Sequence, residues 1–288
     1  MINLLDYVQD LNDNFWIVNL IDDYYKGYMV YEVSDEGTKY NNITKKKYIK
    51  HNQKGFEIIP AFKKIYSAHD FYKSHKNKLS GVWKSYVDAL NEIGISDDSI
   101  GIFGSYLIGF DITKDVDFVI YGRDNLNLYY NYNDYIKNRI NATYITKEHM
   151  MHQYEKHRNN YSSKCDLFEI ISRNWSGVQI CEGVLSTPRF VDLDNQVSPK
   201  DGEKQIVQVE IISGLESAML PRFAEVLYEG EKYKLITNVW KYQSFAKSGD
   251  ILECFGVVDK ISKTIYLSDN ECYIKYLNEC LNTHFILV

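Results

Sequence analysis

Residues 99–122 read SIGIFGSYLIGFDITKDVDFVIYG, and this stretch decides the fold that we expect. A short apolar strand over 100–103 leads into Gly104 and Ser105, and a short helix follows. Such a turn gathers free backbone N–H groups at the positive end of a helix, where a phosphate group can bind. Gly104 lets the backbone approach the phosphate closely, and the Ser105 hydroxyl adds one donor. The stretch therefore predicts a phosphate-binding turn.

The second strand of this stretch begins with two carboxylates, Asp115 and Asp117, and ends at Gly122. Alternation along the strand puts both carboxylates on one face, roughly 6–7 Å apart, while Val116 and Phe118 point to the core. Carboxylates held this close repel each other, and a divalent cation is the usual resolution. A phosphate site beside a metal-binding pair is suited to in-line nucleotidyl transfer with two Mg²⁺ ions, or with Mn²⁺ in their place.

This run resembles the signature of the polymerase-beta-type nucleotidyltransferase superfamily. In that signature an apolar residue, Gly, and Gly or Ser are followed by a short gap and then by Asp, apolar, Asp or Glu, apolar. Here Phe-Gly-Ser at 103–105 is followed by nine residues and then by Asp-Val-Asp-Phe at 115–118. Gly109 matches a further glycine often found in the gap, whereas Lys114 stands where many members have Ser. With its flanking elements the resemblance extends over residues 81–194.

The resemblance implies an enzyme that transfers a nucleoside monophosphate from an NTP to an acceptor hydroxyl and releases pyrophosphate. Gly104 and Ser105 would hold the triphosphate. Asp115 and Asp117 would bridge two metal ions. A third carboxylate, on a neighbouring strand, would complete the metal site and assist the attacking hydroxyl.

Several acidic residues are candidates for this third carboxylate. Asp192 fits best, because its apolar neighbours Val191 and Leu193 would face the core while Asp192 lies beside Asp115 and Asp117. The other candidates are Asp194, Glu182, Asp166 and Glu169.

The elements around the motif predict an α+β fold. Apolar residues recur at helical spacing from 82 to 93, and Gly94 is a natural helix stop. Further helices are expected over 124–139 and 147–158, the latter capped by Thr146. Residues 14–49 and 164–194 are expected to form strands, the latter including CDLFEIIS at 165–172.

The C-terminal segment has short strands with turn residues every ten or so positions, which favours a small antiparallel barrel, of the oligonucleotide-binding type in one reading. We therefore expect three parts. They are a lysine-rich, partly β region (1–80), a nucleotidyltransferase core with a mixed sheet and flanking helices (81–196), and a β-barrel domain (205–288). This layout is similar to an archaeal-type group of nucleotidyltransferases that carry an appended β-domain.

The composition argues for a cytoplasmic protein without a membrane segment. The 288 residues include five cysteines without a C-x-x-C spacing, which favours reduced thiols. No apolar run approaches the roughly 20 residues that a membrane helix needs. The first sixteen residues lack a basic start and are interrupted by aspartates, so a secretory signal is not expected.

Charge is distributed unevenly along the chain, whose net charge is −6. The segment Lys39–Lys84 holds twelve lysines against two acidic residues, a local charge of +10. Such a field attracts a phosphate backbone, so the expected acceptor is RNA with a tRNA-like 3′ end, although a solvated lysine surface gives the same composition. Nucleotidylation of a protein or a small molecule, and a catalytically inactive binding module, are the alternatives.

Overall fold

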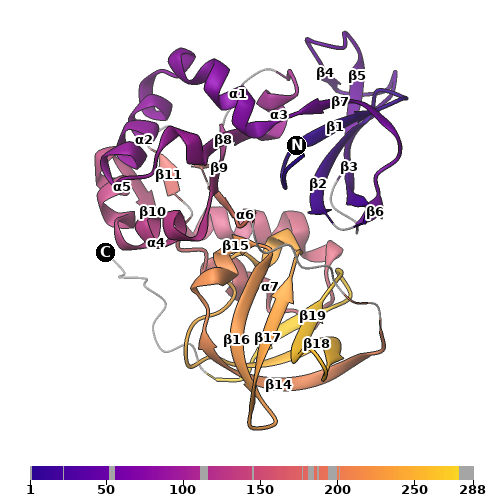
Figure 1. Ribbon diagram of the computed structural model, residues 1–288, viewed down its shortest axis with the longest axis vertical. Coiled ribbons are helices and arrows are strands. Elements are labelled where there is room, and N and C mark those ends of the chain that lie inside the picture. Colours follow the sequence, from indigo (N-terminus) through magenta and orange to yellow (C-terminus); the bar gives the residue numbers. More distant parts are fainter. Residues whose placement is uncertain are drawn as a thin grey trace. The chain divides into compact units, whose positions relative to one another are not determined.

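The computed structural model describes residues 2–21, 23–51, 56–110, 116–144, 146–176, 178–180, 185–186, 188–193, 200 and 202–278. The chain divides into two compact units, one of Met1–Tyr144 with Ser176–Ser198 and the other of Ile145–Trp175 with Pro199–Val288. Figure 1 shows helices and sheets in the first unit and a barrel in the second, so the predicted α+β class is confirmed.

The first unit begins with an antiparallel sheet in the order β4-β5-β3-β2-β1-β7, with β6 paired to β3. Its strands are β1 (Tyr7–Asp10), β2 (Phe15–Ile21), β3 (Tyr25–Val33), β4 (Lys39–Tyr40), β5 (Lys47–Lys50), β6 (Glu57–Ile58) and β7 (Phe62–Tyr66). On one face the rings of Phe15, Tyr31 and Tyr48 surround Phe110, with centroid distances of 6.3, 4.5 and 5.5 Å. Phe110 follows the first half of the motif, so this sheet packs directly on the motif.

The motif itself lies in a smaller sheet of the same unit. Strand β8 (Ile100–Phe103) is antiparallel to β9 (Asp117–Tyr121), and β13 (Arg189–Val191) is parallel to β9. One face holds Phe118 and Phe190, whose rings lie 5.0 Å from Tyr86 and 5.1 Å from Tyr129 on the flanking helices. Aromatic packing from both strands therefore fixes β13 beside β9.

The helices of the first unit agree with the expected pattern in part. They are α1 (Ala68–His75), α2 (Gly81–Glu92), α3 (Gly104–Leu107), α4 (Arg123–Asn131) and α5 (Asn133–Arg139). The helix predicted over 81–94 is confirmed by α2, and the strand over 100–103 by β8. The single helix expected over 124–139 is two helices, α4 and α5, separated at Tyr132. Strand β10 (Ala142–Tyr144) pairs with β11 (Val178–Ile180), which pairs with β12 (Leu185–Ser186).

The second unit contains a closed barrel. Strands pair in the order β14-β16-β17-β19-β18, and β18 returns to β14, while β20 pairs with the first half of β18. The bounds are β14 (Lys204–Ser213), β15 (Met219–Leu220), β16 (Arg222–Tyr228), β17 (Glu231–Thr237), β18 (Ile251–Asp259), β19 (Thr264–Leu267) and β20 (Tyr273–Tyr276). A closed β-barrel in this segment is confirmed. It is not wholly antiparallel as expected, because β17 and β19 run parallel.

Two helices complete the second unit, α6 (Lys147–His157) and α7 (Leu167–Ser172). The Thr146 side chain caps α6 as predicted, by accepting a hydrogen bond from His149 N. The strand prediction for 165–172 was wrong, because a short apolar run reads alike in a strand and in a buried helix. Ile170 of α7 is fully buried in the barrel's apolar core.

The observed units differ from the predicted division into 1–80, 81–196 and 205–288. The first two parts share one unit, and 145–175 belongs to the barrel unit. Packing explains both differences, since Phe110 joins the N-terminal sheet to the motif and Ile170 joins α7 to the barrel. No helix among the described residues is long and apolar enough to cross a membrane.

Candidate active site

The two halves of the predicted motif meet at Gly104. Strand β8 ends at Phe103, which pairs with Asp117 at the start of β9. Gly104 has a φ of +78°, and a Cβ on it would lie 2.2 Å from Asp117 Oδ2. Both the backbone conformation and the close approach therefore require glycine here. Ser105 follows in the first turn of α3, where it is partly exposed.

A guanidinium lies on the same face of the sheet as Asp117. Arg189 pairs with Val119, so its side chain shares the face of Val119 and Asp117. Burial lowers the pKa of Arg189, while the negative charge of Asp117 and the nearby Tyr28 hydroxyl oppose that shift. The charge of Asp117 also helps to raise the pKa of Tyr7, which burial already lifts well above its usual value. Asp117 therefore lies within electrostatic range of Arg189 and of Tyr7 in the N-terminal sheet.

Asp115 lies outside the described residues, as do two candidates for the third carboxylate, Glu182 and Asp194. Of the predicted metal ligands, Asp117 is the one that the structure places at the glycine turn. Within the described ranges, no three His, Cys, Asp or Glu side chains form a group that could hold a metal ion. Because Asp115 is not among them, the predicted carboxylate pair stays a prediction.

The register of β13 corrects the expectation that Asp192 lies beside Asp115 and Asp117. Val191 pairs with Tyr121, and its carbonyl accepts a hydrogen bond from Gly122 N at 2.9 Å. Asp192 is thus level with the residue after β9, about 16 Å along the strand from Asp117. It is buried, with Oδ2 3.8 Å from Arg123 Nη2. Because β13 runs parallel to β9, its C-terminal end lies away from the glycine turn.

The remaining candidates, Asp166 and Glu169, have structural contacts within the barrel unit. Asp166 Oδ2 accepts a hydrogen bond from Tyr276 N at 2.7 Å, which ties the start of α7 to β20. Glu169 Oε1 lies 2.9 Å from Arg173 Nε, one helical turn further on. These contacts explain both carboxylates without a catalytic role.

The N-terminal sheet is bonded to the segment between the two halves of the motif. The buried Asn41 side chain donates to the Ile108 carbonyl at 2.7 Å, and Asn42 N donates to the Gly109 carbonyl at 2.9 Å. Ile43 packs against Gly109, where an added Cβ would lie 2.5 Å from Ile43 Cδ1. The turn between β4 and β5 therefore holds this segment in place.

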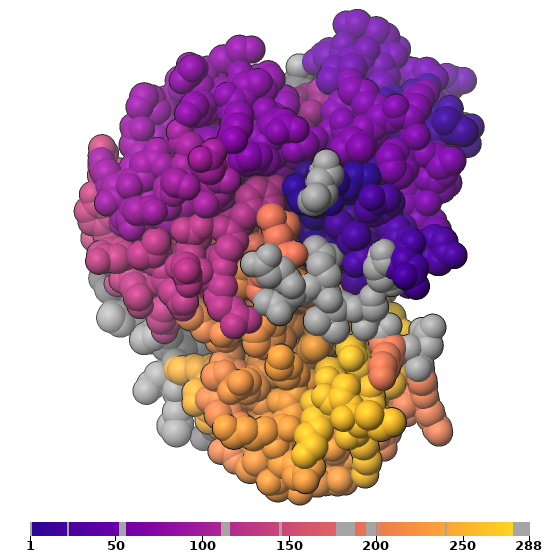
Figure 2. Space-filling view, in the orientation of Figure 1, coloured from indigo at the N-terminus to yellow at the C-terminus, as the bar shows by residue number. Residues whose placement is uncertain are grey.

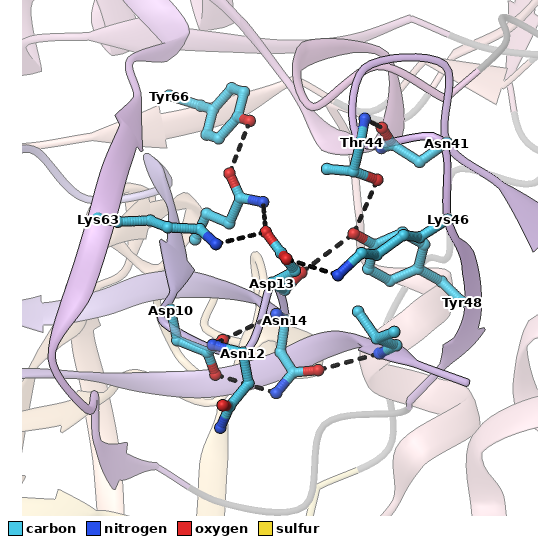
Figure 3. A network of polar contacts seen from close by, with 12 residues as sticks. Asp10, Asn12, Asp13, Asn14, Asn41, Thr44, Lys46, Tyr48, Lys63 and Tyr66 are labelled. Atoms are coloured by element: carbon cyan, nitrogen blue, oxygen red, sulfur yellow. Dashed lines mark hydrogen bonds and ion pairs between the residues drawn. The ribbon is translucent and has the colours of Figure 1, made fainter. Parts of the chain in front are cut away.

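Several lysines of Lys39–Lys84 form ion pairs with aspartates. In Figure 3 Lys46 and Lys63 both point at Asp13, with Nζ–Oδ distances of 2.7 and 2.6 Å, and these contacts lower the pKa of Asp13. Three other lysines pair with aspartates of the first unit. They are Lys73 with Asp98 (2.9 Å), Lys76 with Asp97 (2.5 Å) and Lys84 with Asp88 (2.7 Å). The positive field is therefore weaker than the sequence count of +10 implies.

Sequence reasoning missed Arg189 and Tyr7, both of which feel the charge of Asp117. The alternation of β13 was visible in the sequence, but the strand beside it and the direction of pairing were not.

No protein-family model, no curated protein and no solved structure matches the chain.

Proposed function

We propose that the protein transfers a nucleoside monophosphate from an NTP to an acceptor hydroxyl and releases pyrophosphate. One observation carries this proposal. The backbone of Gly104 lies close to the Asp117 carboxylate. The turn expected to hold phosphate is therefore adjacent to a carboxylate suited to a divalent cation. Neither half of the motif would support this chemistry alone.

Each residue at the turn has a defined role in the proposal. The backbone N–H groups at Gly104 and Ser105 hold the triphosphate. Asp117, together with Asp115, holds Mg²⁺ or Mn²⁺, for which a partly exposed carboxylate facing the turn is a suitable ligand. When bound, the cation supplies positive charge to the phosphates. Arg189, on the face of Asp117, binds the pyrophosphate that leaves, since a guanidinium matches phosphate geometry.

The acceptor that we favour is RNA. Exposed lysines of the β4–β5 hairpin, Lys45 and Lys47, support a phosphate-backbone partner. The five-stranded closure of the barrel, with its parallel β17–β19 pair, supports a relation to oligonucleotide-binding barrels. Protein and small-molecule hydroxyls are the alternative acceptors.

The test is transfer of label from α-labelled NTPs, with Mg²⁺ or Mn²⁺, to RNA, to protein or to a small-molecule hydroxyl. Asp117→Asn should abolish transfer and keep the fold, as judged by circular dichroism. Asp192→Asn is the matched control and should transfer normally. Equal transfer by the wild type and Asp117→Asn would overturn the proposed site, and absence of label on every acceptor would overturn the reaction.

A second candidate function is a binding module without catalysis. The observation that favours it is Arg189, whose positive charge can balance Asp117 where an active enzyme would use a cation. Binding of an NTP that is independent of divalent cations, without transfer, would select this function.

A further inference from the structure

The hairpin formed by β4 and β5 presents an exposed face that joins an aromatic ring to lysine. Tyr40 pairs with Lys47, and Ile49 lies two residues further along β5, so the three side chains share one face. Tyr40 is 51% exposed and Ile49 37%, and Lys47 is exposed as well. Lys45 is exposed in the turn of the same hairpin. The opposite face holds the buried Tyr48 against Phe110.

Lys45 and Lys47 differ from the lysines that pair with aspartates. Lys46, between them in the sequence, is held by Asp13, and Lys73 and Lys84 are held by Asp98 and Asp88. Among the described residues, Lys45 and Lys47 have no acidic partner. Their charges are available to a phosphate backbone. A paired lysine would have to exchange its ion pair with an aspartate for a contact with phosphate.

The place of the hairpin relates this face to the candidate active site. Asn41, in the hairpin turn, is buried and bonded to the Ile108 carbonyl, and Asn42 is bonded to Gly109. Ile108 and Gly109 immediately follow α3, which begins at Gly104. Figure 2, in the orientation of Figure 1, shows the violet atoms of the N-terminal sheet at the upper right, where Figure 1 labels β4 and β5. The turn of the hairpin therefore contacts the segment that follows α3, while the exposed face of the hairpin is turned away from Phe110.

We propose that the exposed face of the β4–β5 hairpin binds a single-stranded RNA end, with a base stacked on Tyr40 and phosphates at Lys45 and Lys47. An exposed aromatic ring beside lysines fits a single strand, because unpaired bases offer their faces for stacking. A duplex hides these faces. The inference rests on the proposed function for its purpose, which is to deliver the acceptor end, but not for its test.

The test measures binding of a short, fluorescently labelled single-stranded RNA to the full-length protein by anisotropy, without NTP. The double variant Lys45→Gln/Lys47→Gln should bind at least about tenfold more weakly. Its plot of log affinity against log salt should be less steep by about 1.4, the value for two lost phosphate contacts on a single strand. Tyr40→Leu should also weaken binding about tenfold but leave the salt slope unchanged, because stacking releases no counterions.

Lys73→Gln/Lys84→Gln is the matched control. It removes the same charge from lysines that are paired with aspartates, and it should change affinity less than about twofold. An equal loss in both double variants would overturn the inference, because it would show a response to net charge alone. Equal affinity for a duplex, or unchanged binding by Tyr40→Leu, would also overturn it.

The outcome is separable from that of the proposed reaction. RNA binding that depends on Tyr40, Lys45 and Lys47 in a protein that transfers no nucleotide would support the surface and refute the reaction. Transfer to RNA by a protein whose hairpin variants bind RNA normally would support the reaction and refute the surface.

Discussion

The two ends of strand β9 carry the same pair of residue types in different surroundings. At one end Asp117 shares a face with Arg189 and lies against Gly104. At the other end Asp192 is buried 3.8 Å from Arg123, where the chain enters α4. A carboxylate beside an arginine is thus not the mark of the site. The glycine distinguishes the two ends, because the backbone of Gly104 lies directly against a carboxylate, whereas a Cβ on Gly122 would meet Asn125.

The largest difference between the two ends should come from their carboxylates. Asp117→Asn should lower nucleotidyl transfer by about a thousandfold or more, because the cation loses a charged ligand. Asp192→Asn should retain wild-type transfer, since it lies about 16 Å along the strand from the glycine turn. Initial rates with α-labelled NTP measure both, and loss of transfer in Asp192→Asn alone would reverse our assignment of the ends.

The glycines at the two ends give the next comparison. Gly104→Ala should lower transfer about a hundredfold, because its Cβ would displace Asp117 and small shifts of reacting groups have effects of this size. Gly122 also has a positive φ, +96°, but a Cβ there meets only Asn125 Nδ2 at 3.5 Å. Gly122→Ala should therefore lose about 1–3 kcal/mol of stability and little activity. Similar rates for both variants at equal folded concentration would contradict the special role of Gly104.

The arginines test the proposed phosphate contact. Arg189→Gln should raise the KM for NTP by about ten- to a hundredfold, as expected for loss of a hydrogen bond to a charged group. Arg189→Lys should recover part of this loss, because it keeps the charge without the paired geometry. Arg123→Gln should leave the KM unchanged, and steady-state kinetics at varied NTP concentration compare the three variants. A KM equal to that of the wild type in Arg189→Gln would remove Arg189 from the site.

The smallest effect on transfer is expected at Asp6. It is near the Gly122 end, since burial raises the pKa of Tyr121 and the charge of Asp6 raises it further. Asp6 is fully buried and accepts hydrogen bonds from Ala68 N and Asn3 N, both at 2.9 Å. Burial raises its pKa to about 6, so the folded protein holds a proton that the unfolded chain releases near pH 4.

The raised pKa of Asp6 makes the free energy of unfolding decrease as pH rises. A raised carboxyl pKa means that the folded state binds more protons between about pH 4 and 6, so Asp6 makes the protein less stable as pH rises through that range, by at most about 3 kcal/mol. Asp6→Asn should remove this component from urea unfolding measured across the range, with transfer nearly unchanged. The same pH dependence in the wild type and Asp6→Asn would show that another group is responsible.

Much of the local structure near the motif could be predicted. The spacing of apolar residues identified α2, and the run into Gly104 identified β8 and its turn. At 165–172 the same kind of pattern misled, because Leu167 and Ile170 are buried three residues apart on a helix. The run is too short for its period to separate a strand from a helix.

The position of the third carboxylate could not be predicted from the sequence. Asp192 does follow a buried strand, as its apolar neighbours suggested, yet that strand runs parallel to β9 and carries Asp192 away from Asp117. The same register brings Arg189 toward Asp117. The sequence contains both residues within a few positions and holds no sign of which one meets the site.

The sequence by itself determined the strand ending in a glycine turn and the short strands of the barrel. These features depend on backbone conformation and on the alternation of side chains over a few residues. The tertiary structure alone decided that Arg189 lies on the face of Asp117, that Asp13 holds Lys46 and Lys63, and that Asn41 secures the motif segment. Such contacts join segments far apart in the chain, and their register follows from packing of the whole core rather than from local preference.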